Sequence, residues 1–112
     1  TPGYGKQIHR DRPHQVVILL IYFDDLIDCG GELMLYRPRN GVAPNRIDRR
    51  DVPEEMVEPV ETLPCRANSG VLMLNSADAY HAVSPMVEGA PPRRFLGLAI
   101  SKRYTRDAWR PA

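Results

Sequence analysis

The chain has three histidines, and one of them, His9, is followed two positions later by an aspartate, Asp11. Such a pair of side chains could bind a metal ion. His9 and Asp11 are separated by one residue, so in an extended segment both side chains point to the same face. His81 lies far downstream, in a short strand of its own. Two imidazoles and one carboxylate form the facial triad of non-haem Fe(II) sites, which leaves positions open for a co-substrate and dioxygen. The H-x-D pair alone is a weak signal, because a surface histidine followed by a turn-forming aspartate gives the same pattern.

Arginines at the start of an apolar segment, residues 93–101, are candidates for binding an acid. A guanidinium binds a carboxylate through two parallel hydrogen bonds, which lysine cannot do. Alternation places Arg93 on a face with Phe95, Gly97 and Ala99, two of which are small enough to leave room for a ligand. Arg94 shares the other face, whose apolar residues suit packing against a covering layer. Arg93 is therefore the predicted binding residue and Arg94 the alternative.

Tyr22, near the end of an apolar segment, could reach a polar ligand with its hydroxyl, although the residue taken alone fits a core aromatic with a satisfied hydroxyl better. His14 precedes the same segment and has no carboxylate two residues away, which favours a capping or surface role. Trp109 is interpreted as a packing residue.

Short strands must position these side chains. The chain has 112 residues, enough for one domain (1–112), and its 11 prolines and 8 glycines indicate many turns. No apolar period typical of a helix extends over three turns, and only Thr105 to Trp109 could begin a short helix. The pattern predicts an all-β sandwich or barrel. Seven segments are strand candidates: 4–8, 15–23, 32–36, 57–63, 70–75, 80–83 and 93–101.

The strand candidates carry further expectations about their places in the sheet. Segment 15–23 is predicted to be buried on both faces, and a turn at Gly30-Gly31 joins it to 32–36. Pro59 interrupts segment 57–63, which predicts an edge strand. The polar segment of about residues 37–56 is either a mobile insertion or a flap over a site. Its arginines are interleaved with acids, which favours a solvated, self-paired surface.

Composition and charge exclude several classes of partner. A net charge of +1 gives no argument for nucleic acid or an anionic membrane. The longest apolar run, Val16 to Phe23, is far shorter than the roughly 18–20 residues that span a bilayer, and no signal peptide is visible. Cys29 and Cys65 have no metal-ligand spacing, so free thiols in a reducing, cytoplasmic compartment are expected.

Several motifs, in order, resemble one enzyme superfamily. They are His9-x-Asp11 followed by Pro13, then Ile-Leu-Leu-Ile-Tyr-Phe-Asp, Gly-Gly-Glu-Leu-Met-Leu-Tyr, Gly-Val-Leu-Met-Leu-Asn, Tyr-His-Ala-Val-Ser-Pro-Met and Arg-Arg-Phe-Leu. Together they resemble the Fe(II)/2-oxoglutarate-dependent dioxygenases, and most of all the prolyl-4-hydroxylase-like branch. The resemblance runs from about Tyr4 to Ser101. Each motif is only moderately specific, but their shared order makes chance an unlikely explanation.

The resemblance implies a double-stranded β-helix, the jelly-roll or cupin-like architecture. It implies Fe(II) held by His9, Asp11 and His81, and 2-oxoglutarate held by Arg93 or Arg94 with help from Tyr22. Dioxygen would be the second co-substrate, and ascorbate is a further candidate. The implied reaction hydroxylates a C–H bond of a peptide or small-molecule substrate, with release of succinate and CO2.

The chain also departs from this superfamily. Only eight residues precede His9, where the superfamily usually has a helical layer and a further strand, so we expect a minimal or N-terminally truncated core. An uncovered apolar sheet face would favour a homodimer. The nucleic-acid demethylase branch is disfavoured, because Ala99 and Ile100 stand where its second arginine would be. A metal-binding cupin that does not use 2-oxoglutarate, and a catalytically incomplete jelly-roll binding module, remain alternatives.

Overall fold

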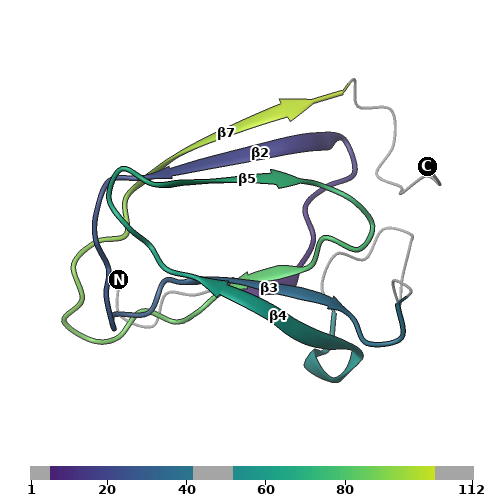
Figure 1. Ribbon diagram of the computed structural model, residues 1–112, viewed down its shortest axis with the longest axis horizontal. Helices are drawn as coiled ribbons and strands as arrows, with labels where there is room; N and C mark the ends of the chain where they lie inside the picture. The colour runs from purple at the N-terminus through teal and green to yellow at the C-terminus, as the bar shows by residue number, and fades with distance from the viewer. Residues whose placement is uncertain (1–5, 42–51, 103–112) are drawn as a thin grey trace.

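The computed structural model describes residues 6–41 and 52–102, which form two antiparallel β-sheets facing each other (Figure 1). The expectation of an all-β domain is confirmed over these ranges, where the one helical element is the 3-10 turn η1, Glu54–Met56. None of the described residues belongs to a helix that is long and apolar enough to cross a membrane. The strands are β1 (Lys6–His9), β2 (Gln15–Tyr22), β3 (Leu33–Pro38), β4 (Val57–Leu63), β5 (Gly70–Leu74), β6 (His81–Val83) and β7 (Phe95–Ser101).

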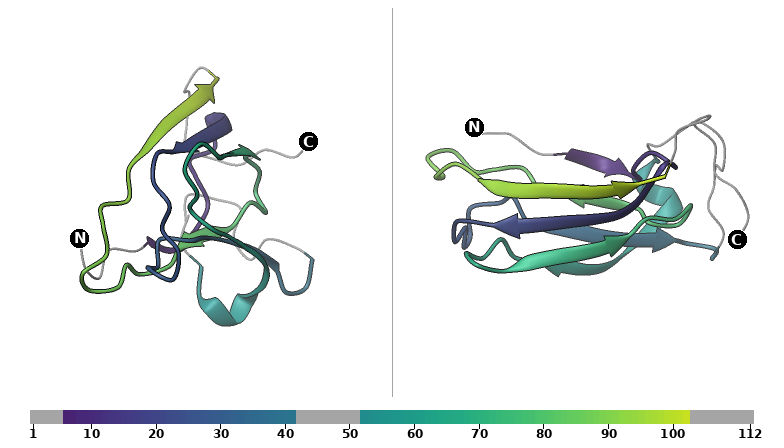
Figure 2. Two further views of the ribbon diagram at one scale, coloured as in Figure 1. Left: turned by 60° about the vertical axis from the view of Figure 1, so that its left-hand side comes forward. Right: turned by 90° about the horizontal axis from the view of Figure 1, so that it is seen from above.

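The two sheets take strands from both halves of the chain. One sheet has four strands in the order β1-β6-β3-β4, and the other has three in the order β5-β2-β7. Figure 2 shows β7, β2 and β5 as one layer over the other sheet. All seven expected strands are present, with ends that shift by up to two residues. Pro59 lies in β4, at the edge of the four-stranded sheet, as expected for a residue without a backbone N–H.

The Gly30–Gly31 turn takes the chain from one sheet to the other. Both glycines have positive φ, 77° and 76°, and a Cβ on Gly30 would collide with the backbone of Pro85. β2 and β3 are consecutive along the chain, as expected, but they lie in different sheets and form no hairpin. The segment between β2 and β3 and the segment between β4 and β5 both pass from one sheet to the other. A backbone bridge between Leu26 and Cys65 links these two segments.

The expectation that β2 is buried on both faces is wrong. Its inner face points toward the four-stranded sheet, but its outer face has no covering layer among the described residues. Leu19, on that outer face, pairs with Leu72 and Leu98, whose exposed fractions are 68% and 53%. The continuous apolar pattern of β2 is therefore that of a central strand covered on one face.

The predicted 37–56 loop is shorter than expected at both ends. Arg37 and Pro38 belong to β3, and residues 54–56 form η1. Arg37 donates a hydrogen bond to Glu58 at 2.7 Å, which agrees with a self-paired surface for that arginine. The central part of the loop lies outside the described residues, as do the expected helix at 105–109 and Trp109.

Candidate metal centre

The structure brings together the three residues whose types predicted a metal site. His9 ends β1, Asp11 follows two residues later, and His81 opens β6 directly opposite His9 in the register. The Asp11 carboxylate lies 3.7 Å from Nε2 of His9 and 3.6 Å from Nε2 of His81. Both histidines are buried, with exposed fractions of 5% and 6%. The predicted placement of His9 and Asp11 on one face is therefore confirmed.

Backbone carbonyls determine that Nδ1 carries a proton in both imidazoles. Nδ1 of His9 lies 2.6 Å from the Gln7 carbonyl, and Nδ1 of His81 lies 3.0 Å from the Ala79 carbonyl. A carbonyl can only accept a hydrogen bond, so each Nδ1 carries the proton in these contacts. In the neutral imidazole, Nε2 then holds the lone pair, and this atom faces Asp11 in both histidines. This is the arrangement by which metal-binding histidines are oriented in proteins.

The donor set fits a divalent transition-metal ion. One ligand atom from each of His9, Asp11 and His81 lies within 4.8 Å of the others. Ligand atoms at about 2.1 Å from a metal, in adjacent octahedral positions, are about 3.0 Å apart, so a small inward movement of the side chains is sufficient. Two nitrogens and one carboxylate suit iron, and three donors on one side leave coordination positions for exogenous ligands.

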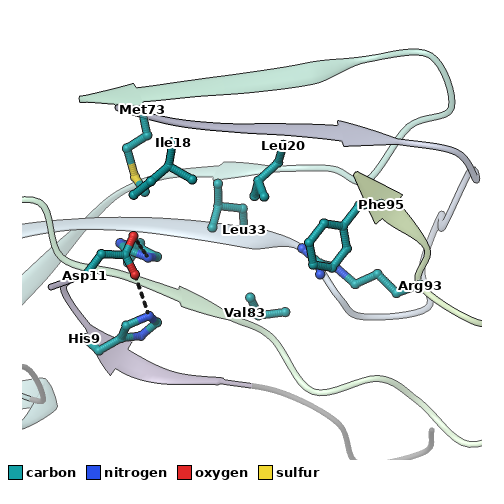
Figure 3. Close-up of a pocket in the computed structure, with 10 residues that line it drawn as sticks. His9, Asp11, Ile18, Leu20, Leu33, Met73, Val83, Arg93 and Phe95 are labelled. Atoms are coloured by element: carbon teal, nitrogen blue, oxygen red, sulfur yellow. Dashed lines mark ion pairs between the residues drawn. The ribbon is translucent and has the colours of Figure 1, made fainter. Parts of the chain in front are cut away.

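A cavity of about 210 Å³ extends from this cluster between the two sheets. Figure 3 shows His9 and Asp11 at one end and Arg93 with Phe95 at the other. The remaining wall is apolar and comes from both sheets: Ile18, Leu20, Leu33, Met73 and Val83. The volume is below the range of about 300–1,000 Å³ that is usual for drug-sized ligands, so the cavity suits a small molecule.

Of the described residues that line this cavity, Arg93 is the only arginine or lysine. Its Nε donates a hydrogen bond to the Gly31 carbonyl at 2.9 Å. Its guanidinium carbon also lies 4.8 Å from the centre of the Phe95 ring and 5.4 Å from that of Tyr22. These contacts orient the guanidinium plane.

Tyr22 lies next to Arg93 and is not part of the cavity wall. The residue is 1% exposed, and its hydroxyl has no hydrogen-bond partner within the described structure. Burial raises the pKa of Tyr22 above its usual value of 10.0, and the positive charge of Arg93 opposes this rise. A buried hydroxyl without a partner is uncommon in proteins, and the charged group that acts on this one is Arg93.

Arg94 and His14 lie apart from the cluster. Arg94 forms two hydrogen bonds with Asp24, at 2.9 and 2.7 Å, and this contact lowers the pKa of the Asp24 carboxyl. The alternation argument therefore separates the two arginines correctly with respect to the cavity. His14 is half-buried, and its backbone carbonyl accepts a hydrogen bond from Lys102.

Two contributors to the site were not expected from the sequence. The Gly31 carbonyl orients Arg93, although the Gly-Gly pair indicated only a turn. Arg10, the middle residue of the H-x-D pair, is completely buried. The composition of the motif gave no signal for this burial, because an arginine beside a turn is usually exposed.

The fold and the site define a protein of two antiparallel sheets with a His-Asp-His cluster that could hold a metal ion. Comparison of the chain with protein families, with curated proteins and with solved structures gives no match. The arrangement of the residues themselves is thus the basis for proposing a function.

Proposed function

We propose that this protein is an Fe(II)- and 2-oxoglutarate-dependent oxygenase of the prolyl-4-hydroxylase-like branch. One observation carries the proposal: a buried His9-Asp11-His81 cluster and a cationic Arg93 line the same small cavity. A metal site at one end and an oriented guanidinium at the other match the two ends of a 2-oxo dicarboxylic acid. The substrate that is hydroxylated would be a peptide or a small molecule.

The proposed architecture is a jelly-roll, or double-stranded β-helix. In support, each sheet combines early and late strands: β1, β3, β4 and β6 in one, and β2, β5 and β7 in the other. Strands from the beginning and the end of the chain are expected to alternate between the sheets in this way when a long hairpin is wrapped into two facing sheets. Seven strands are described, where a jelly-roll has eight.

Each residue then has a defined task. His9, Asp11 and His81 would hold Fe(II), whose chemistry is to combine dioxygen and 2-oxoglutarate so that a substrate C–H becomes C–OH and succinate and CO2 are released. Asp11 supplies negative charge that offsets part of the charge of the ion. The carbonyls of Gln7 and Ala79 would keep Nδ1 as the hydrogen-bond donor, so that each neutral imidazole presents the lone pair of Nε2 to the ion.

Arg93 would bind the carboxylate of 2-oxoglutarate that is distant from the metal. Because Nε is engaged with the Gly31 carbonyl, the two terminal Nη atoms are the groups that can bind a carboxylate end-on. Tyr22 would assist through its contact with Arg93, since it lies beside the guanidinium and does not line the cavity. The apolar wall of the cavity keeps water from the reacting atoms and strengthens the electrostatic contacts within it. Ascorbate is a further candidate, as a reductant that restores Fe(II).

The free thiols of Cys29 and Cys65 support a reducing compartment, and we propose the cytoplasm.

The decisive experiment measures binding and turnover on the intact chain. Without oxygen, calorimetric titration should show that 2-oxoglutarate binds the Fe(II)-loaded protein much more tightly than the metal-free protein. After admission of air, succinate should accumulate. Fe(II) binding with no effect of 2-oxoglutarate would instead support a cupin that does not use this co-substrate. Binding of both without succinate, across a panel of peptides and small molecules, would support a catalytically incomplete module.

A further inference from the structure

Arg10 is placed between two of the candidate metal ligands, yet its side chain is directed away from them. The residue is completely buried, with an exposed fraction of 0%. Its Nη1 donates a hydrogen bond to the Ala77 carbonyl at 2.7 Å, across 67 positions of sequence. Its guanidinium carbon lies 5.4 Å from the centre of the Tyr80 ring. Burying a guanidinium costs free energy, so its contacts are expected to be specific.

These contacts join the two segments that carry the ligands. Arg10 is bonded through the backbone to His9 on one side and to Asp11 on the other, whereas Tyr80 directly precedes His81. Ala77 belongs to the turn that leads into β6. The paired part of the backbone ladder between β1 and β6 ends at His9 and His81, and its register shifts between Lys6 and His9. Asp11 therefore lies beyond the last backbone pairing, where side-chain contacts hold the segment: Arg10 donates to the Ala77 carbonyl, and Asn75 donates to the Arg12 carbonyl.

We propose that Arg10 is a positioning residue of the metal centre, whose guanidinium fixes the distance between Asp11 and His81 by holding the H-x-D segment against Ala77 and Tyr80. The proposal rests on the proposed metal-binding function, and it adds a residue that coordinates nothing. A planar guanidinium suits this task, because it can donate to a carbonyl in its plane and stack on a ring with its face. Lysine can do the first of these but has no planar group for the second.

Cobalt(II) provides the test, because its visible absorption bands report the coordination geometry independently of turnover. Wild type and the variants Arg10→Met and Arg10→Lys are titrated with Co(II), and their free energies of unfolding are measured in urea. Changes in the groups that orient metal ligands commonly lower metal affinity about 10- to 100-fold. Arg10→Met should show a loss of about tenfold or more with shifted bands, and Arg10→Lys should fall between it and the wild type.

The matched control is Val57→Ala. Val57 is 1% exposed and packs in the same small core as Tyr80, but it comes from β4, which supplies no candidate ligand. This variant should lose stability while keeping the wild-type Co(II) affinity and bands. If Arg10 were merely structural, Arg10→Met would lose stability as Val57→Ala does and would keep the wild-type Co(II) affinity and absorption bands.

The outcomes separate the two proposals. A wild-type protein that binds neither Co(II) nor Fe(II) overturns the metal centre and, with it, this role of Arg10. A wild-type protein that binds Co(II), with Arg10→Met unchanged in affinity and spectrum, overturns the role of Arg10 and leaves the metal centre intact. If Arg10→Met does not fold, Arg10→Lys decides, since wild-type affinity and bands in that variant contradict the proposal.

Discussion

The two sheets bury different kinds of side chain, and the contrast is clearest between β6 and β7. All three residues of β6 are buried, including His81, whereas all seven residues of β7 are exposed. The four-stranded sheet carries both histidines of the candidate metal centre, while the three-stranded sheet, with Arg93 just before β7, supplies much of the apolar wall. Both histidines thus lie on the better-buried sheet, where neighbouring backbone carbonyls orient their rings.

The largest expected effect concerns the metal end of the cavity. Asp11→Ala removes the only carboxylate of the candidate ligand set, so iron-dependent succinate formation should be abolished. The matched control is Glu88→Ala, which removes an exposed carboxylate that does not line the cavity. Succinate release is measured for both at saturating 2-oxoglutarate. Undiminished turnover of Asp11→Ala would exclude the assigned ligand set.

The next effect concerns the other end of the cavity. Arg93→Met keeps an unbranched apolar stem but removes the guanidinium and its hydrogen bonds to a charged partner, which are worth about 1.5–3 kcal/mol. The KM for 2-oxoglutarate should therefore rise about 10- to 150-fold, since each 1.4 kcal/mol is a factor of about ten. Arg94→Met should leave this KM unchanged, because Arg94 is paired with Asp24 outside the cavity. Equal effects of the two variants would contradict the separation of the arginines.

A third experiment compares the inner and outer sides of the molecule by stability. Leu33 lies on β3, is 2% exposed and lines the cavity, whereas Leu72 lies on β5 and is 68% exposed. Leu33→Ala should reduce the free energy of unfolding by about 2–5 kcal/mol. In the monomer, at a protein concentration too low for two copies to associate, Leu72→Ala should change it by no more than about 0.5 kcal/mol. Urea denaturation at one protein concentration measures both, and a large loss for Leu72→Ala would mean that something covers the outer face.

The sequence predicted the strands and the neighbouring positions of His9 and Asp11 because both depend on local rules, whereas the inclusion of His81 in the ligand set was implied by the family resemblance. Alternation along an extended chain places His9 beside Asp11 and distinguishes Arg93 from Arg94, without knowledge of any distant contact. The burial of β2 could not be predicted in this way. Its apolar run is the same whether one face or both are covered, and coverage depends on layers elsewhere in the fold.

The roles of Arg10 and Gly31 were beyond local reasoning for a related reason. Arg10 contacts Ala77, and Gly31 contacts Arg93, across 67 and 62 positions of sequence. Neither contact leaves a periodic pattern in the sequence. Such contacts can be predicted only when the register of the sheets is known. The resemblance to an enzyme superfamily implied neither of them.

Among the residues that the structure describes, nothing covers the outer face of the three-stranded sheet, which predicts self-association. Leu72, Leu74, Leu98 and Ile100 are each more than half exposed, and β2, β5 and β7 contain no charged residue. Two copies could therefore face each other without burying a charge, and we expect a homodimer. Light scattering should show a mass that rises with concentration, and Leu98→Lys should lower it. A strictly monomeric mass of the wild type at all working concentrations would contradict this prediction.

The smallest expected effect is a dependence of stability on alkaline pH. Burial raises the pKa of Tyr22 above 10.0, so an unfolded tyrosine loses its proton before the folded one does. The contribution to stability is therefore complete below pH 10 and decreases as the pH rises through the folded pKa. Urea denaturation at about pH 8 and about pH 11 should show a smaller alkaline loss for Tyr22→Phe than for the wild type. Some loss should persist, because burial also raises the pKa of Tyr80.

The charge of Arg93 opposes the upward shift in the pKa of Tyr22. Arg93→Met should therefore make the free energy of unfolding fall more steeply with alkaline pH, and an unchanged slope would mean that the two side chains do not interact.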